Sequence, residues 1–256
     1  FRASCHTPLL LWRLRSQSNI STWVRQVMTL VERRPRISAF FPMYNEEDNI
    51  RSTALAAIAV LEDLASDFEI ILVDDGSTDR TAILGAELCK ADARIQIVTH
   101  SSNRGYGAAV RTGFSSSQLD LITFTDGDGQ FDLHDLELLL REIANHDIVI
   151  GYRIQRADPL IRRTTAKAWG FLVGLLFGVW PKDLDCGFKL FRRESLTELD
   201  LRADGAFIST ELLAKAKVAG YRIAQVGVNH YPRQRGRSTG NNPKVVIRAF
   251  VELFLF

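Results

Sequence analysis

The sequence has few cysteines, and their arrangement builds no recognisable site. Cys5, Cys89 and Cys186 are widely separated and odd in number. A disulfide framework uses an even set of cysteines, and a zinc site uses ligands at short, regular spacings. The pattern therefore argues against both classes and favours a reducing compartment.

The sequence also lacks a long hydrophobic run. The apolar helical segment Ala168–Trp180 has 13 residues, whereas a bilayer span needs about 20. The Arg-rich residues 1–34 contain no long apolar core, so they do not resemble a secretory signal. We treat 1–34 as a poorly determined arm, within which Met28 could be the natural start. No internal repeat or low-complexity segment is visible.

The net charge is small but unevenly distributed. The whole chain carries +2. Residues 1–150 hold 14 Lys and Arg against 21 Asp and Glu, a net charge of −7, and residues 151–256 hold 18 against 9, a net charge of +9. An acidic front half suits a metal site, and a basic back half suits an anionic acceptor or a membrane surface. Surface charge without a function is the alternative.

Apolar runs and helical patterns alternate along most of the chain, which at 256 residues has the length of one large α/β domain. Strands are predicted at Ile37–Phe41, Glu69–Val73, Arg94–Thr99, Leu121–Thr125, Asp147–Gly151, Gly187–Phe191 and Tyr221–Val228. Helices are predicted at 49–64, 81–90, 108–117, 133–144, 168–180 and 209–218. This alternation predicts a mostly parallel sheet with right-handed crossovers. The terminal segment Val245–Phe256 is amphipathic, so it is either an interfacial helix or the beginning of a spanning one.

The stretch Leu121–Gln130 has the strongest chemical pattern. A buried strand is predicted to end at two carboxylates, Asp126 and Asp128, with glycines between and after them that allow a sharp turn. Gln130 adds a third oxygen donor. Hard cations such as Mg²⁺ take such oxygens and keep positions open for phosphate. We therefore predict a metal at the carboxyl end of a central strand. The alternative is an acidic surface turn.

The loop after the first predicted strand, Pro42–Glu47, is suited to holding a nucleoside. Pro42 ends the strand, Tyr44 offers a stacking face, and Glu46 offers a hydrogen-bond acceptor. The alternative is an ordinary helix start with Asn45 as the cap. Both roles are compatible.

Paired acids follow the second predicted strand, in Val73–Asp79. They can accept hydrogen bonds from a base N–H or a ribose hydroxyl. Capping of the next helix by Ser77 or Asp79 would need only one acid, so we favour a functional role. The later Gly105–Val110 stretch matches only part of a dinucleotide fingerprint and follows the wrong strand, so we interpret it as a tight turn.

These motifs together resemble a known family. Pro-x-Tyr-Asn-Glu, Val-Asp-Asp-Gly-Ser-Thr-Asp, Asn-Arg-Gly and Asp-x-Asp-x-Gln occur in the order found in family 2 glycosyltransferases, over about residues 36–240. The resemblance implies the GT-A fold, a Rossmann-like, mostly parallel sheet flanked by helices. The later motifs, at 151–153, 162–163, 185–189 and 233–238, resemble the polyprenyl-phosphate branch, which includes dolichyl-phosphate mannose synthase.

The resemblance also implies a division of the chain. Residues 1–34 would be the arm, and 35–240 the glycosyltransferase domain. Within that domain, about 35–150 would bind nucleotide-sugar and metal, and 151–240 would receive the acceptor. Residues 241–256 would form an amphipathic, membrane-facing helix.

Roles for single residues follow from the same resemblance. The nucleoside would be held by Pro42, Tyr44, Glu46, Val73 and Asp75. Mg²⁺ or Mn²⁺ on the diphosphate would be held by Asp126, Asp128 and Gln130, with the Gly127 backbone nearby. Arg153 and Arg233 would contact phosphates and, with Asp128, serve catalysis. The family often has Lys where Thr239 stands here, and Arg235 or Arg237 could compensate for that lost cation.

The implied reaction is inverting, metal-dependent transfer of a hexosyl group, mannose or glucose, from a GDP-mannose or UDP-glucose class donor to a polyprenyl monophosphate. A phosphate acceptor is already anionic near pH 7, because its second pKa is about 6, so it needs no strong general base. We accordingly interpret Glu211 as an acid in a helix's first turn and His230 as a packing residue.

The expected location is the cytoplasmic face of a membrane, reached peripherally or through spans outside this chain. A separate membrane-spanning partner is compatible with this, and no nucleic-acid partner is expected. Three rival functions remain: a family 2 enzyme of cell-envelope polysaccharide synthesis with a saccharide or protein acceptor, a nucleotidyltransferase, and a non-catalytic binding module.

Overall fold

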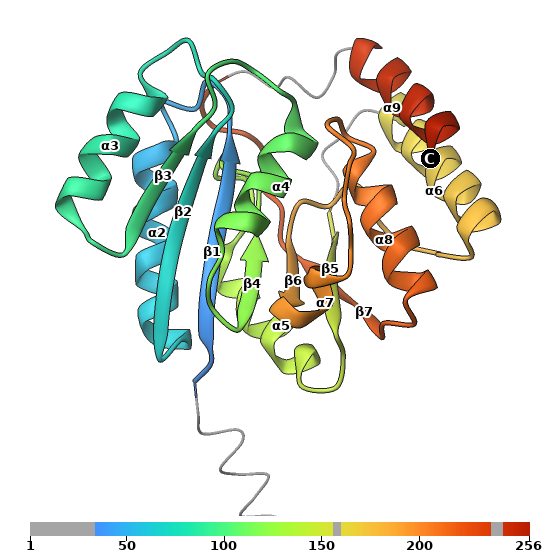
Figure 1. The fold of residues 1–256 in the computed structure, drawn as a ribbon, viewed down its shortest axis with the longest axis horizontal. Helices are drawn as coiled ribbons and strands as arrows, with labels where there is room; N and C mark the ends of the chain where they lie inside the picture. Colours follow the sequence, from blue (N-terminus) through green and yellow to red (C-terminus); the bar gives the residue numbers. More distant parts are fainter. Residues whose placement is uncertain (1–33, 156–159, 237–242) are drawn as a thin grey trace, which may run out of the picture. The chain divides into compact units, whose positions relative to one another are not determined.

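The computed structural model describes residues 34–155, 160–236 and 243–256 (Figure 1). Arg36–Phe256 form one compact unit. The predicted arm lies almost entirely outside the described residues, as does the predicted cation Arg237 with its neighbours up to residue 242.

The described residues form a seven-stranded sheet in the order β3-β2-β1-β4-β6-β5-β7. Its strands are β1 (Arg36–Met43), β2 (Asp67–Asp74), β3 (Ile95–Thr99), β4 (Leu121–Phe124), β5 (Ile148–Arg153), β6 (Lys189–Arg192) and β7 (Ile223–Val228). Strand β6 runs antiparallel to β4 and β5, whereas the other neighbouring pairs are parallel. The predicted strands and the mostly parallel sheet are therefore confirmed.

Helices cover both faces of this sheet (Figure 1). They are α2 (Ile50–Leu64), α3 (Thr81–Ala91), α4 (Tyr106–Ser116), α5 (Leu136–Ile143) after a 3₁₀ turn (Leu133–Asp135), α6 (Leu160–Phe177), α7 (Arg193–Thr197), α8 (Ile208–Val218) and α9 (Pro243–Leu255). Side chains of α2, α3 and α5 join one apolar cluster, and those of α4, α6 and α8 join the other. The layered α/β architecture expected of the GT-A fold is present.

Helix α6 begins at Leu160, eight residues before the predicted start at Ala168, because its first turns lack the apolar pattern that the prediction used. Two further differences from the predicted helices have local causes. Helix α6 ends at Phe177, three residues before the predicted end, because Gly178 takes φ of 67°, a left-handed conformation that commonly terminates helices. Helix α7 was not predicted, since its five residues are too few to show a helical period.

Aromatic rings fix the strand that carries the predicted metal ligands. The Phe40 and Phe124 rings stack with centroids 4.9 Å apart, and Phe124 stacks on Phe191 at 6.1 Å. The Phe114 ring packs edge-on against all three. Such pairs add directional packing to the burial of their area. The end of β4 is therefore held by a rigid aromatic group.

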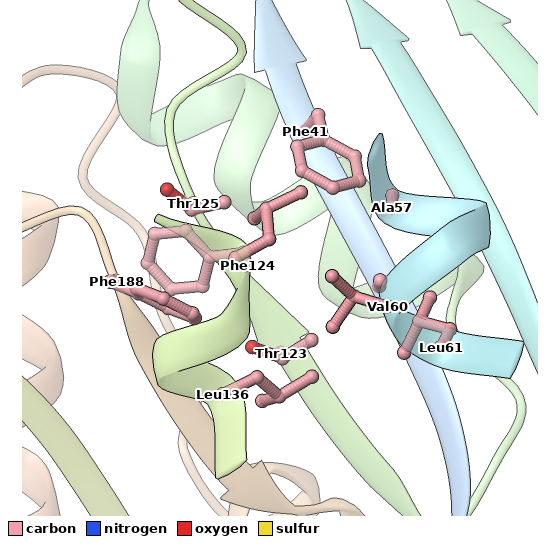
Figure 2. Close-up of a pocket in the computed structure, with 11 residues that line it drawn as sticks. Phe41, Ala57, Val60, Leu61, Thr123, Phe124, Thr125, Leu136 and Phe188 are labelled. Atoms are coloured by element: carbon pink, nitrogen blue, oxygen red, sulfur yellow. The ribbon is translucent and has the colours of Figure 1, made fainter. Parts of the chain in front are cut away.

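A small cavity lies on the other side of β4, between this strand, β1 and α2 (Figure 2). Its volume is about 20 Å³, and Phe41, Leu61 and Phe188 are among the side chains around it. Space of this size holds about one water molecule. The cavity is thus a feature of the core beneath the site and is too small for a nucleotide.

Candidate functional site

The loops that carry the motifs leave the sheet at one edge. In the register of the central strands, Met43 lies opposite Asp74, and Phe40 lies opposite Phe124. Because β1, β2 and β4 are parallel, their carboxyl ends meet at the same edge. The three motif loops that were separate in the sequence are therefore neighbours.

The loops after β1 and β2 hold one another through reciprocal hydrogen bonds. The backbone amide of Asn45 donates to Ser77 Oγ at 2.8 Å, and its side-chain oxygen, Oδ1, accepts from the backbone amide of Thr78 at 2.8 Å. The Glu46 amide donates to Thr81 Oγ1 at 2.9 Å. Asn45 itself has φ of 55°, a conformation that Asn tolerates better than most residues. Asn45 therefore links two loops and does not cap α2 with its side chain.

Three of the residues predicted to hold a nucleoside lie close together at this edge. Pro42 and Val73 are buried and paired across β1 and β2, and Tyr44 is half-buried in the loop that follows. The structure thus brings them together, and their contact with a nucleoside stays a prediction.

The paired acids after β2 have different surroundings. Both are buried, Asp74 with 1% and Asp75 with 3% of its surface exposed. Asp75 accepts hydrogen bonds from the Arg104 and Gly105 amides, both at 2.9 Å, and its Oδ1 lies 2.7 Å from His100 Nδ1. The carboxylate of Asp75 therefore holds the loop before α4. His100 was missed, because a lone histidine after a strand carries no sequence signal.

Asp74 retains an open oxygen. Its Oδ1 accepts from the Ser77 amide at 3.0 Å. Within the described ranges, its buried Oδ2 has no hydrogen-bond partner. A buried acceptor without a partner is costly unless a ligand satisfies it. Of the two acids, Asp74 is thus the better placed to accept a hydrogen bond from a nucleoside, although the sequence favoured Asp75.

Asp126 lies just past β4 in a closely packed setting. The Tyr106 hydroxyl donates to its Oδ1 at 3.1 Å. Burial, followed by repulsion from Asp128, raises the pKa of Asp126 to about 6. A Cβ on Gly187 would lie 2.6 Å from the Asp126 carboxylate, so only glycine fits there. Tyr106 and Gly187 were not predicted to shape the metal site.

Asp128 and Gln130 continue the turn. Asp128 Oδ1 accepts from the Gln130 amide at 3.1 Å. The Gln130 side chain donates through Nε2 to the Tyr231 carbonyl at 2.9 Å. This hydrogen bond attaches the turn to the back half of the chain. Gly127 is held through its carbonyl, which accepts from Thr53 Oγ1 at 3.3 Å.

These residues fit a hard divalent cation. No group of three or more His, Cys, Asp or Glu residues suited to a metal occurs in the part of the chain that the structure describes. Asp126 and Asp128 are nevertheless close enough for their charges to interact: after burial, the charge of Asp128 is the next cause of the raised pKa of Asp126. Mg²⁺ characteristically binds through one or two carboxylates and completes its shell with phosphate oxygens and water. Two carboxylates beside the loops predicted to hold a nucleoside would therefore suffice.

Arg233 connects the two halves of the chain at this site. Its Nη2 lies 2.6 Å from both Glu46 carboxylate oxygens, and its Nη1 lies 3.6 Å from Asp128 Oδ2. Burial raises the pKa of Glu46, whereas hydrogen bonds from Asn49 and Arg233 act in the opposite direction. The guanidinium thus lies between an acid of the predicted nucleoside loop and an acid of the predicted metal site.

Arg153 has a different setting from the one the sequence suggested. Its guanidinium forms a bidentate pair with Asp183, at 2.6 and 3.0 Å, and both side chains are less than 10% exposed. As Glu46 does for Arg233, Asp183 fixes the guanidinium of Arg153. Its predicted phosphate contact stays a prediction, and Asp183 was missed.

Glu211 and His230 have the kinds of contact that the sequence favoured. The buried Glu211 carboxylate, in the first turn of α8, accepts from the Arg202 and Ala203 amides at 2.8–3.0 Å and pairs with Lys215 at 2.7 Å. The His230 ring packs edge-on against Phe131, with centroids 4.9 Å apart. Neither contact has the form expected of a general base aimed at a sugar hydroxyl.

Helices α6 and α9 lie side by side (Figure 1). Both helices, and Trp180 just after α6, carry exposed apolar side chains. The Trp169 and Phe250 rings meet at 4.9 Å, and those of Phe177 and Phe256 at 5.5 Å. We call the exposed side chains the apolar face: Phe171, Leu175, Leu176, Trp180, Phe250, Val251, Phe254 and Phe256. None of the helices in the described ranges combines the length and the hydropathy that crossing a bilayer requires.

Comparison with known proteins places this geometry in a family. The family model described as glycosyl transferase family 2 matches residues 38–200. The glycosyltransferase AglD of Haloferax volcanii is 31% identical over 79% of this chain and 35% of its own length. Dodecaprenyl-phosphate galacturonate synthase of Rhizobium johnstonii is 29% identical, over 79% of this chain and 61% of that protein. Human dolichyl-phosphate beta-glucosyltransferase is 31% identical, over 76% of this chain and 67% of that protein.

The chain therefore spans between about a third and two thirds of the length of these relatives. Among solved structures, glucosyl-3-phosphoglycerate synthase from Mycobacterium tuberculosis, crystallised with Mn²⁺, UDP and glucosyl-3-phosphoglycerate, has a TM-score of 0.63. It is 21% identical, over 86% of this chain and 79% of that one, a likeness that concerns the fold alone. By its motifs, its GT-A fold and these matches, the chain belongs to glycosyl transferase family 2.

Proposed function

We propose that this chain carries out inverting, metal-dependent transfer of a hexosyl group from a nucleotide-sugar to a polyprenyl monophosphate at a membrane surface. The donor would be of the UDP-glucose or GDP-mannose class, and the product a lipid-linked sugar for glycan assembly. The observation that carries the proposal is the apolar face of α6 and α9, which belongs to the same compact unit as the acidic pair Asp126 and Asp128. A soluble acceptor would not need such a face.

The relatives support the same acceptor class. Their names specify dodecaprenyl, dolichyl and, for a Salmonella enzyme 29% identical over 79% of this chain, undecaprenyl phosphate. The sugars in those names differ, being galacturonate, glucose and 4-deoxy-4-formamido-L-arabinose. These relatives therefore share the acceptor class and differ in the sugar.

On the donor side, Asp126 and Asp128 would hold Mg²⁺ or Mn²⁺, with Gln130 beside them. When bound, the cation would neutralise charge on the departing nucleoside diphosphate. Arg233 Nη1 lies 3.6 Å from Asp128 Oδ2. Its guanidinium would therefore be within reach of a diphosphate bound beside Asp128 and would stabilise the same charge. Tyr44, Glu46 and Asp74 would orient the nucleoside, with Pro42, Val73 and Asp75 supporting their loops.

The acceptor phosphate would attack without a general base. An anionic phosphate oxygen has no proton to lose before it attacks the anomeric carbon. Glu211, near the start of α8, is the acid to compare with a general base. Its carboxylate already accepts hydrogen bonds from the Arg202 and Ala203 backbone amides and pairs with Lys215. That arrangement supports a phosphate acceptor over a sugar hydroxyl, which would require a base.

We further propose that residues of about 35–150 serve the donor and those of 151–240 the acceptor, with 241–256 docking on the membrane. The enzyme would work at the cytoplasmic face, peripherally or together with spans outside this chain. A separate membrane-spanning partner is compatible with this arrangement.

The reaction is tested by supplying radiolabelled UDP-glucose or GDP-mannose, Mn²⁺ and polyprenyl-phosphate vesicles, and measuring label in the organic-extractable lipid. Label should enter the lipid, and nucleoside diphosphate should be released in equal amount. Pyrophosphate release in a separate reaction, supplied with a nucleoside triphosphate and a sugar 1-phosphate, would indicate a nucleotidyltransferase. Label in a water-soluble saccharide or in protein would overturn the proposed acceptor, and no transfer with any donor would favour a binding module.

Membrane docking is tested by flotation with anionic, prenyl-phosphate-containing vesicles. Phe254 in the apolar face is 86% exposed, so Phe254→Ser should weaken binding by removing apolar area. Val218 on α8 is similarly exposed, at 89%, but is not part of the apolar face. Val218→Ser is therefore the matched control and should float as the unaltered protein does. Equal flotation of both variants would contradict docking through α9.

A further inference from the structure

The loop that connects α7 to α8 lies between two helices that the sequence gave no reason to associate. Residues 202–205 contact the beginning of α4 on one side and the polar side of α9 on the other. Helix α4 begins next to the candidate site, whereas α9 carries part of the apolar face. The contacts of this loop therefore connect two regions that the proposed function uses separately.

On the α4 side, the loop caps the helix with its backbone. The Asp204 carbonyl accepts from the Gly107 amide at 2.8 Å and from the Ala108 amide at 3.2 Å. A Cβ on Gly105 would lie 2.5 Å from the Asp204 carbonyl oxygen, and one on Gly107 would lie 2.7 Å from the Gly205 oxygen. The loop thus satisfies amide groups that helix starts leave unpaired, and it leaves no room for side chains between the two backbones.

On the α9 side, one carboxylate holds the loop. Glu252 Oε1 accepts from the Gly205 amide at 3.0 Å and from Arg248 Nε at 3.0 Å. Arg248 Nη2 also lies 3.6 Å from Asp204 Oδ2. The other Glu252 oxygen is buried and has no hydrogen-bond partner in the described ranges. Such charge-assisted hydrogen bonds are stronger than neutral ones, so Glu252 is the main polar attachment of α9 to this loop.

The beginning of α4 matters because its first residues reach the site. The Tyr106 hydroxyl donates to Asp126 Oδ1 at 3.1 Å. The adjacent Gly105 amide donates to Asp75 at 2.9 Å. A shift of the first turn of α4 would therefore move a group bonded to a proposed metal ligand and a group bonded to the loop after β2.

We propose that Glu252 is a positioning residue. Through the Gly205 amide it holds loop 202–205 against α4, and so keeps the Tyr106 hydroxyl on Asp126. Arg248 assists by holding the Glu252 carboxylate and approaching Asp204. The same helix would then dock on the membrane through its apolar side and set the donor site through its polar side. The structural part of the inference stands on the contacts above, and its consequence for metal and donor binding rests on the proposed function.

Hydrogen–deuterium exchange tests the structural part without any activity. Arg111 and Glu211 also bind residues 202–204, so Glu252→Ala should loosen the loop without releasing it. In Glu252→Ala, the Gly107 and Ala108 amides should therefore exchange severalfold faster, because the Gly205 end of the loop that carries their acceptor carbonyl is no longer fixed to α9. Glu252→Gln keeps an acceptor for the Gly205 amide and should restore protection. Val251→Ala, on the exposed side of α9, is the matched control and should leave the exchange rates of the Gly107 and Ala108 amides unchanged. Unchanged protection in Glu252→Ala, with the variant folded, would overturn the inference.

A second measurement addresses the site. In Glu252→Ala, the Mn²⁺ dissociation constant and the KM for the donor should rise by about tenfold, with a smaller change in the temperature of unfolding than Leu253→Ala causes by removing core packing. Glu252→Gln should again lie close to the unaltered protein. Faster exchange with unchanged Mn²⁺ affinity would refute the link to the site. Absence of sugar transfer in the unaltered protein would instead count against the proposed function and leave the exchange result to decide the inference.

Discussion

Two buried acids, Asp75 in the front half of the chain and Asp183 in the back half, have partners of different kinds. In the front half, acids hold backbone amides: Asp75 accepts from the Arg104 and Gly105 amides, and Asp79 accepts from the Thr81 amide. In the back half, Asp183 instead holds the buried cation Arg153, whereas Glu211 holds backbone amides as Asp75 does. Asp75 and Asp79 thus fix the loops beside the candidate site, and Asp183 fixes a cation within the back half.

This difference indicates which groups remain to act on a ligand. Many motif residues are engaged in the scaffold, so membership of a motif does not make a residue a ligand contact. Arg233 from the back half instead contacts two acids of the front half. Its guanidinium lies 2.6 Å from Glu46 and 3.6 Å from Asp128. A diphosphate with its cation would have to bind among them, and the predictions that follow test that expectation.

The largest effect is expected for Asp128→Ala. Loss of a charge that stabilises the departing diphosphate through the cation should lower sugar transfer at least about a hundredfold. The fold should be kept, because Asp128 accepts only a local hydrogen bond from the Gln130 amide and a long contact from Arg233. Transfer of radiolabelled sugar and thermal unfolding should be measured together. Activity within a few-fold of the unaltered protein would remove the metal from the proposal.

The next largest effect is expected where the halves meet. Arg233→Met removes the cation between Glu46 and Asp128 and should raise the KM for the donor by about tenfold. Arg235→Met is the matched control, since Arg235 Nη1 donates to the Asp48 carbonyl, at 3.5 Å, and among the described residues its side chain pairs with neither Glu46 nor Asp128. Steady-state kinetics with each variant would separate the two arginines. An equal effect of both would show that general positive charge matters and that the contact of Arg233 does not.

Much of the fold was predictable, because periodicity and strand-ending motifs are local. The strands and most helices follow from apolar alternation, and the convergence of the motif loops follows from a parallel sheet. Helix α7 and the early end of α6 at Gly178 depended on five residues and on one backbone angle. The mostly parallel sheet was predicted without the direction of β6, which a run of four residues does not reveal.

The site was less predictable, because its details depend on partners distant in sequence. Asp75 looked like the ligand contact and Asp74 like its companion, yet His100 and the Arg104 loop engage Asp75. Tyr106 forms a hydrogen bond with Asp126, 20 residues further along the chain, and Arg153 pairs with Asp183, 30 residues further along. Residue types at a motif give the chemistry that is available, but only the packing shows which atoms are already satisfied.

The paired acids after β2 provide an intermediate test. Asp75→Asn replaces an acceptor of several hydrogen bonds and should lower the free energy of unfolding by about 2 kcal/mol. Asp74→Asn should change stability much less, because only the Ser77 amide depends on it. It should instead weaken binding of the nucleotide-sugar by about tenfold. Chemical denaturation and donor titration by calorimetry would distinguish the variants, and the reverse pattern would assign the ligand contact to Asp75.

The smallest effect is expected at a partly exposed pair that joins the two halves, Asp147 with Arg222. Asp147, before β5, accepts from the Arg222 backbone amide at 2.9 Å and from its guanidinium at 3.0 and 3.1 Å. Hydrogen bonding from the Arg222 side chain lowers the pKa of Asp147 below its ordinary value of 3.8. The stability that it contributes is therefore fully present above that value and is lost as the pH falls through the lowered pKa.

Asp147→Asn should cost less than about 1 kcal/mol of stability at pH 7, because the pair is half exposed. The difference between the variant and the unaltered protein should shrink below about pH 4, as urea unfolding at pH 7, 5 and 3 would measure. A difference that stays constant over this range would mean that neutral hydrogen bonds, and not the charge of Asp147, join β5 to β7.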